Sequence, residues 1–318
     1  MPNLELKARL DNLLSTAQAE TSHIDVLAPI IVADREECPL CMIPISIKPK
    51  ETIFKHCCGK HICVGCSVAQ SMNDLKNRVP DHKKKCAFCR QQSPKNTIKA
   101  LKKLMKKNNP NAFMAMAGRY RTGDGVIQSD TKMLEMHIRA AELGDAKAFG
   151  AIGLHYLEGI GVEQDRSEEL SFYEVAAKKG DIQAHHQIAE FHNRSAGLGI
   201  AQMHALIREY YSESSALECD RSNAFVEINE IVQNMGSEKA PQHLIAALQE
   251  TNGIYQKSIT HLKVAANAGY QQAMDSLMEL YKMKAVPKED LTQTLRAFQA
   301  STAEMKSKDR DDVRAMGW

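Results

Sequence analysis

Residues 148–184 read AFGAIGLHYLEGIGVEQDRSEELSFYEVAAKKGDIQA, and this stretch decides the fold. Residues 112–148 carry the same pattern 36 positions earlier, with Tyr120 in the place of Tyr156. Both stretches have an Ala-Phe start, a Gly-x-Gly-Val turn, an Ala-Ala pair and a final Gly-Asp. A fixed period of roughly 20 to 50 residues is typical of stacked structural repeats rather than of one globular core.

Further copies follow with less similarity. One begins at Ala184 and contains a four-residue insertion, and its later matching positions are Tyr211, Ser215, Ala216 and Asp220. Another ends in the run 264–270, and a last one opens at Ala273 with Tyr281 in register. The repeats therefore account for most of the chain after residue 110.

Each repeat is predicted to be a pair of helices. The first helix ends near Tyr156, and Gly159 and Gly161 permit the positive φ angles that reverse the chain. Leu154, Tyr156 and Phe172 are expected to fill the space between helices, which the small paired alanines allow to approach closely. Each unit can bury its apolar stripe only against its neighbours.

The 36-residue pattern resembles the Sel-one-like repeat, a relative of the tetratricopeptide repeat, over roughly residues 111–316. The resemblance implies an α-solenoid whose concave face usually binds another protein. We therefore expect a mainly α fold, with a protein client bound on the solenoid of residues 111–318.

The composition is that of an ordinary globular chain. Its 318 residues suggest about two folding units. The shares of hydrophobic residues (43%) and charged residues (25%) exclude wholesale disorder and a collagen-like chain. No apolar run approaches the roughly 18 to 20 residues of a membrane-spanning helix, and the charged N-terminus does not read as a secretion signal. We expect a cytoplasmic protein, with the nucleus as the alternative.

Eight of the nine cysteines fall between Cys38 and Cys89. In a reducing compartment such a cluster indicates metal binding rather than disulfides. Three Cys-x-x-Cys pairs are present, namely Cys38 with Cys41, Cys63 with Cys66, and Cys86 with Cys89. This spacing directs two sulfurs at one tetrahedral ion, so the segment predicts structural zinc. Six sulfurs exceed one site and fall short of two, so a fourth pair is needed.

The order of the pairs resembles a RING finger over residues 38–90. In that family the first and third pairs hold one zinc ion and the second and fourth hold another. The resemblance implies one site made of Cys38, Cys41, Cys63 and Cys66, and a second site that includes Cys86 and Cys89. The stretch 56–61 must complete the second site. We expect Cys57 and Cys58 there, with His56 or His61 as the alternative to Cys57, because neighbouring side chains usually diverge.

RING fingers that act as ubiquitin ligases bind a ubiquitin-conjugating enzyme charged with ubiquitin. Leu40 matches the family's apolar contact for that enzyme, and Arg90 matches the arginine that bridges the enzyme and ubiquitin. Two departures favour a non-catalytic scaffold instead: Ala87 stands where proline is common, and no tryptophan precedes Cys86. Both functions are kept as hypotheses. A lipid-binding FYVE finger is disfavoured, because Lys55 stands where that family requires cysteine.

The parts of the chain are expected to be an N-terminal amphipathic helix (1–36), the finger (37–92), a basic connecting helix (93–110) and the repeats (111–318). The N-terminal helix has leucines at 4, 10, 13 and 14, and it packs either on its own chain or on a partner.

Residues 76–107 carry a net charge of +11. We do not expect nucleic acid as a partner, because only Phe88 is near enough for base stacking.

Overall fold

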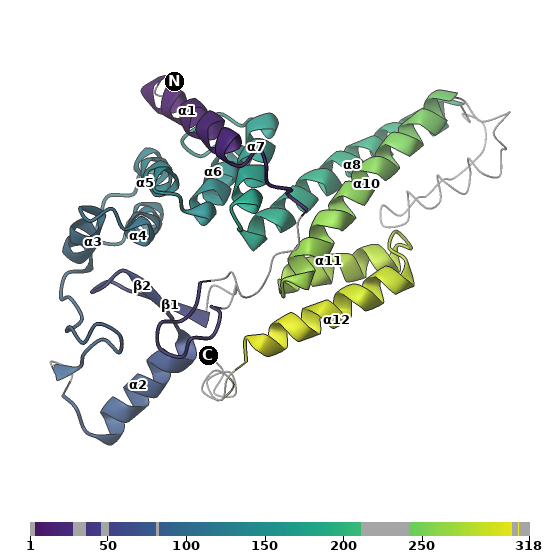
Figure 1. Cartoon of the computed structure of the whole chain (residues 1–318). Helices are drawn as coiled ribbons and strands as arrows, with labels where there is room; N and C mark the ends of the chain where they lie inside the picture. Colours follow the sequence, from purple (N-terminus) through teal and green to yellow (C-terminus); the bar gives the residue numbers. More distant parts are fainter. Residues whose placement is uncertain are drawn as a thin grey trace. The chain divides into compact units, whose positions relative to one another are not determined.

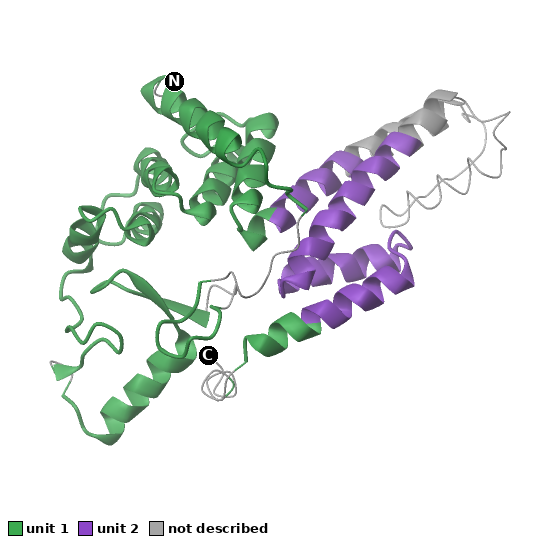
Figure 2. Cartoon of the chain, viewed as in Figure 1, with its two compact units in different colours: residues 1–184, 299–318 green, residues 185–298 purple. Residues whose placement is uncertain are grey.

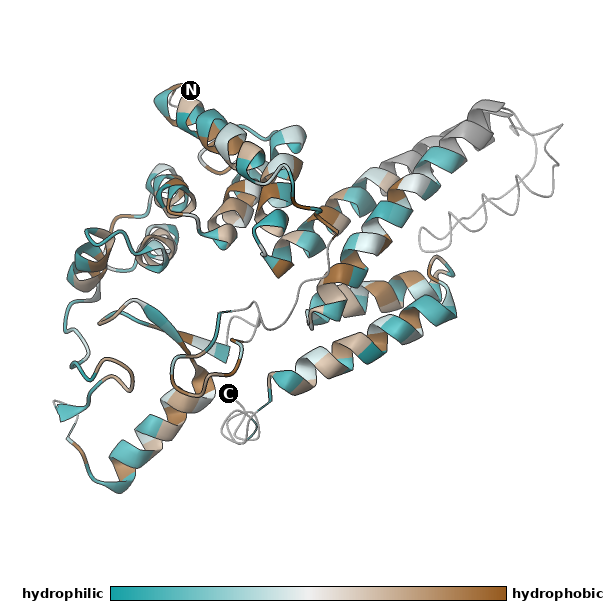
Figure 3. Cartoon of the chain, in the orientation of Figure 1, coloured by the Kyte–Doolittle hydropathy of each residue, from teal (hydrophilic) through white to brown (hydrophobic). Residues whose placement is uncertain are grey.

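The computed structural model describes residues 4–27, 36–45, 51–80, 83–210, 242–306 and 311. Within these residues the chain forms eleven helices and one two-stranded sheet, so the expected mainly α fold is confirmed (Figure 1). The chain divides into two compact units, 1–184 with 299–318 and 185–298 (Figure 2). Hydrophilic and hydrophobic residues alternate along the helices (Figure 3). None of the described helices has the length and apolarity needed to cross a membrane.

The first unit begins with helix α1 (Leu4–Glu20), which packs against two later helices, α5 (Asp130–Glu142) and α7 (Arg166–Lys178). Its buried residues are Leu6, Leu10, Leu14 and Ala17. The stripe expected from the sequence was partly wrong, because Leu4 is 87% exposed. Leu6 takes its place because it lies four residues before Leu10, on the same helix face.

The cysteine-rich part contains little regular structure. Strands β1 (Thr52–Lys55) and β2 (Lys60–Cys63) pair antiparallel, with Thr52 opposite Cys63 and Lys55 opposite Lys60. Helix α2 (Val64–Lys76) follows β2 directly. A segment this small buries too little apolar surface to be stable without a further support such as bound metal.

The two clearest repeats form two helix pairs. Helices α4 (Pro110–Thr122) and α5 make the first pair, and α6 (Ala146–Glu158) and α7 make the second. Every helix boundary in the second pair lies 36 residues after its counterpart in the first, which confirms the predicted period. The expected connecting helix is α3 (Thr97–Met105), and it packs against α4 through Leu101 and Leu104.

The turn and core residues mostly behave as the sequence predicts. Gly159 and Gly161 have φ angles of +71° and +77° after α6 ends. The rings of Tyr156 and Phe172 stack with their centroids 5.6 Å apart, and both residues are buried. The expectation for Leu154 was wrong, since this side chain is 40% exposed. It lies two residues from Tyr156, which places it on the far side of a helix with 3.6 residues per turn.

In its described residues the second unit consists of four helices. Its members are α8 (Ile182–Tyr210), α10 (Gln242–Asn267), α11 (Gln271–Lys282) and α12 (Lys288–Glu304), of which α8 and α12 extend into the first unit. Ala265 and Ala266 are buried and Gly269 has a φ of +83°, as expected for the end of a repeat. The matching positions predicted at Tyr211, Ser215, Ala216 and Asp220 lie outside the described residues.

Candidate metal centre

The structure gathers eight thiols into two groups of four. One group is formed by Cys38, Cys41, Cys63 and Cys66, and the other by Cys57, Cys58, Cys86 and Cys89. Within each group all sulfur atoms lie within 4.8 Å of one another. The groups alternate along the chain, because the first and third pairs meet in one and the second and fourth pairs in the other. This is the grouping that the resemblance to a RING finger implies.

Two of the pairs lie in turns of the same shape. In the turn of Cys38 and Cys41, the backbone N–H of Met42 donates to the carbonyl oxygen of Cys38 at 2.9 Å. In the turn of Cys86 and Cys89, the N–H of Arg90 donates to the carbonyl oxygen of Cys86 at 3.0 Å. Met42 and Arg90 both have positive φ angles, +56° and +60°, which non-glycine residues seldom adopt. Two equal turns thus present one cysteine pair to each group.

The pair of Cys63 and Cys66 lies at the start of α2. Cys63 caps this helix, and its sulfur accepts a hydrogen bond from the backbone N–H of Cys66 at 3.4 Å. The sulfur of Cys38 accepts from the N–H of Cys63, also at 3.4 Å. Backbone donors and a helix N-terminus both stabilise negative charge on sulfur, so this location suits thiolate ligands.

Cys57 and Cys58 lie in the tight turn between β1 and β2. The N–H groups of Cys58 and Gly59 both donate to the carbonyl oxygen of Lys55, at 3.2 and 2.8 Å. Gly59 closes the turn with a φ of +72°. In this turn the two neighbouring cysteines both reach the second group, although adjacent side chains usually diverge.

The two histidines considered as alternatives belong to neither group. The His56 ring meets Phe54 edge-on at 5.3 Å, and the His61 ring lies 5.4 Å from the same phenyl group. Nδ1 of His61 lies 3.9 Å from a carboxylate oxygen of Glu36. The geometry therefore favours Cys57 over either imidazole as the fourth member of the second group.

The sulfur positions fit a tetrahedral metal ion. Zinc bound at about 2.3 Å by four sulfurs separates those sulfurs by about 3.8 Å. The distance between the sulfurs of Cys41 and Cys63 is 3.9 Å, and that between Cys57 and Cys89 is 3.5 Å. Both groups can therefore hold a metal ion of this size.

The pKa shifts of the thiols fit the same interpretation, namely thiolates that surround a metal ion. Burial opposes ionisation of Cys38, but backbone hydrogen bonds outweigh it and lower its pKa to about 7. Burial and the neighbouring Cys63 raise the pKa of Cys66. In the second group the pKa of Cys86 is lowered by backbone donors despite burial, while burial and Cys89 raise that of Cys57. Four crowded sulfurs cannot all ionise together unless a cation compensates their charge.

Leu40 and Arg90, the two residues expected to contact a conjugating enzyme, lie beside different thiol groups. Leu40 is partly buried and packs against the cluster of Cys38, Ile45, Ile62 and Cys63. Arg90 is exposed and directly follows Cys89. Phe88, in the same turn, is 41% exposed.

One packing contact was not anticipated from the sequence. Phe54 of β1 packs against a hydrophobic cluster on α3 and α4 that includes Leu101, Leu104 and Met116. It is the only Phe, Tyr or Trp between Cys41 and Cys57, which is the one signal the sequence offers. The contact joins the cysteine-rich segment to the first repeat.

Comparisons with known proteins give structural similarity only. No family model matches the chain, and no curated protein matches it. A solved Sel1 repeat protein from Oxalobacter formigenes shares 23% identity, covering 74% of this chain and 86% of that one, with a TM-score of 0.33. A protective antigen of uropathogenic Escherichia coli strains, which displays an SLR fold, shares 19% identity over 69% of this chain and 51% of that one, with a TM-score of 0.28.

Proposed function

We propose that the chain is a zinc-binding adaptor that acts as a RING-type ubiquitin ligase, with its repeats recruiting a protein client. The observation that carries this proposal is the alternation of the two thiol groups along the chain. Alternating pairs are the arrangement that the RING resemblance implies, and simple consecutive sites would not produce it.

The metal in such a centre has a structural role. Four thiolates would complete the coordination of each zinc ion, and no position remains open for water or substrate. Zinc binding contributes roughly 10 to 16 kcal/mol in small zinc-finger peptides at neutral pH. The turns that present Leu40 and Arg90 would depend on that contribution for their shape. Available thiolates also require a reducing compartment, so we place the protein in the cytoplasm or nucleus.

The chain's own contribution to ubiquitin transfer would be binding and orientation. Leu40 supplies an apolar contact for the conjugating enzyme. Arg90 offers a planar fork of N–H donors that can bridge carbonyl oxygens on the enzyme and on ubiquitin. Holding the thioester in a reactive pose accelerates transfer without a nucleophile from this chain.

A non-catalytic scaffold is the second candidate. The packing of Leu40 against Cys38, Ile45 and Ile62 favours it, because a side chain committed to the finger's own core has less surface to offer an enzyme. Ala87 in the place of proline favours it as well.

Self-ubiquitylation with a panel of conjugating enzymes separates the two functions. We expect activity with at least one enzyme, and a loss of tenfold or more in Arg90→Ala and Leu40→Ala. Arg121→Ala is the matched control, because Arg121 is an exposed arginine on α4 and is not adjacent in sequence to any of the eight cysteines. Zinc content is measured for every variant, so that a loss of activity is not confused with a loss of metal. A wild-type chain that retains zinc but is inactive with all enzymes is a scaffold.

A further inference from the structure

We propose that the surface of α5 and α7 now covered by α1 is a binding site for an amphipathic helix of a partner protein. Such a partner helix carries leucines at every fourth position and cationic side chains beside them. The proposal rests on the recruiting role suggested above for the repeats, and it specifies the chemistry of the client.

The apolar part of this surface accepts a regular leucine stripe. Leu6, Leu10 and Leu14 lie four residues apart on one face of α1, and their exposed fractions are 5%, 0% and 8%. They are covered by α5 and α7, which belong to different repeats. A helix that lays an apolar stripe into a groove between other helices is a common mode of peptide recognition.

The charges at the rim determine which helix fits. Arg9 of α1 pairs with Glu142 at the end of α5, at 2.7 Å. Lys7 pairs with Glu168 in the first turn of α7 at 3.3 Å. Glu20 at the other end of α1 pairs with Lys179 just after α7, at 3.0 Å. These contacts align α1 in the same direction as α7 and select cationic residues at its start and an acidic residue at its end.

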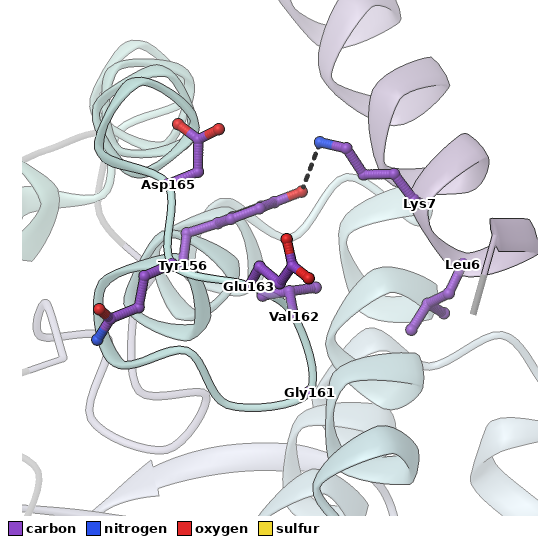
Figure 4. Close-up of a pocket in the computed structure, with 8 residues that line it drawn as sticks. Leu6, Lys7, Tyr156, Gly161, Val162, Glu163 and Asp165 are labelled. Carbon is purple, nitrogen blue, oxygen red and sulfur yellow. Dashed lines mark hydrogen bonds between the residues drawn. The ribbon is translucent and has the colours of Figure 1, made fainter. Parts of the chain in front are cut away.

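The helix α1 leaves part of the surface unfilled. A cavity of about 290 Å³ lies beside its first turn, lined by Leu6, Lys7, Tyr156 and residues 161–165 (Figure 4). The Lys7 ammonium group spans its edge and donates to the Tyr156 hydroxyl at 3.3 Å. A partner helix can therefore make contacts here that α1 does not make.

Exchange of α1 for a partner is physically reasonable. Isolated helices of about this length are only marginally stable in water, so α1 gains most of its order from docking. Its rim pairs are partly exposed, so they add little to the free energy of docking, and they act mainly by excluding helices with the opposite charge pattern. The tether to the same chain adds to the leucine contacts by raising the local concentration of α1, and a free partner helix has to compete with this tethered one.

The test is binding of a labelled peptide of residues 4–20 to full-length chains. The variant Leu10→Glu places a charge at the most deeply buried position of α1 and displaces it from the surface. We expect the peptide to bind this variant at least tenfold more tightly than it binds the wild type, because the tethered competitor is gone. A peptide that itself carries Leu10→Glu is the matched control and should not bind.

A charge reversal keeps the test informative if Leu10→Glu unfolds the chain, which far-UV circular dichroism would reveal. Glu142→Arg weakens the hold on α1, and a peptide with Arg9→Glu should then bind this chain several-fold more tightly than the unmodified peptide does. The proposal is overturned if no peptide binds a folded variant, or if the reversed pair shows no preference. It is also overturned if the wild type forms a dimer that the peptide dissociates, since the occupant is then a second copy of α1. Zinc and conjugating enzymes play no part in this assay, so its failure leaves the function of the finger untouched.

Discussion

The Nδ2 atom of Asn109 donates a hydrogen bond to the carbonyl oxygen of Gly59, 3.4 Å away. The Oδ1 atom of the same side chain accepts from the N–H of Ala112 at 3.0 Å and caps α4. One amide therefore holds the start of the first repeat and the turn that carries Cys57 and Cys58. Together with Phe54 it makes the cysteine-rich segment part of the repeat's own packing.

Substitution at Asn109 separates these two contacts. Asn109→Ala removes both, and we expect a loss of about 1 to 2 kcal/mol in the free energy of unfolding. Asn109→Asp keeps an oxygen to cap α4 but loses the donor to Gly59, so its loss should be smaller, about 0.5 to 1 kcal/mol. Urea denaturation measures both values. Asn96→Ala is the control, because Asn96 caps α3 in the same way. If the aspartate variant is as damaging as the alanine variant, the cap has no separate role.

Two glycines in equivalent helices should respond to alanine in opposite ways. A Cβ atom at Gly118 of α4 would meet nothing within 4 Å, so Gly118→Ala should stabilise the protein by about 0.5 to 1 kcal/mol. At Gly153 of α6 the new atom would lie 2.8 Å from the ring of Tyr173, which is buried and cannot move away. Gly153→Ala should therefore destabilise by about 1 to 3 kcal/mol. Thermal unfolding of both variants checks the prediction, and equal shifts would contradict it.

The sequence was sufficient for what depends on local periodicity. The 36-residue offset gave both helix pairs and the left-handed glycines between their helices, because each of these features is fixed by a few neighbouring residues. It was insufficient where distant segments meet. Leu154 is apolar yet faces outward, and the role of Phe54 depends on a surface about fifty residues later in the chain. For Cys57 and Cys58 the sequence left His56 and His61 open, since only the conformation of the turn at Gly59 decides which side chains reach the second group. That these thiols bind zinc stays a prediction.

Metal analysis tests that prediction directly. We expect two zinc ions per purified chain, one in each thiol group. Cys41→Ser and Cys89→Ser change different groups, so each variant should retain about one ion fewer than the wild type. Cys219→Ser is the control, because Cys219 lies outside the cluster of eight. A wild-type content other than two, or an equal loss in the control, would contradict the assignment.

Removal of zinc should also weaken the first repeat. Without metal the turn at Gly59 and strand β1 lose their support, so Asn109 and Phe54 lose their partners. A strong chelator is expected to lower the thermal midpoint while most of the helical circular dichroism remains, because the repeat cores bury their own aromatic residues. A chelated chain with an unchanged midpoint would show that the finger and the repeats are energetically independent.

Acid should destabilise the repeats through buried histidines. Nδ1 of His137 lies 2.9 Å from Nε2 of His155, which connects α5 to α6. Burial, with contributions from His155 and Arg121, lowers the pKa of His137 to about 3. In the second unit burial, with His261 adding to it, lowers the pKa of His185 to about 3 as well. An unfolded histidine has a pKa of about 6.5, so acid favours the unfolded chain, which binds more protons.

The sign of this effect fixes the pH window. The stability contributed by the neutral imidazoles is complete above about pH 6.5 and is lost as the pH falls from there toward about 3. Each histidine that is protonated only on unfolding costs about 1.4 kcal/mol per pH unit within that window. Urea midpoints measured at pH 7.5, 6 and 5 should therefore decrease progressively. In His137→Asn one titrating group is absent, so the decrease between pH 6 and pH 5 should be shallower than in the wild type. Parallel slopes for the two proteins would show that His137 is not protonated on unfolding in this range.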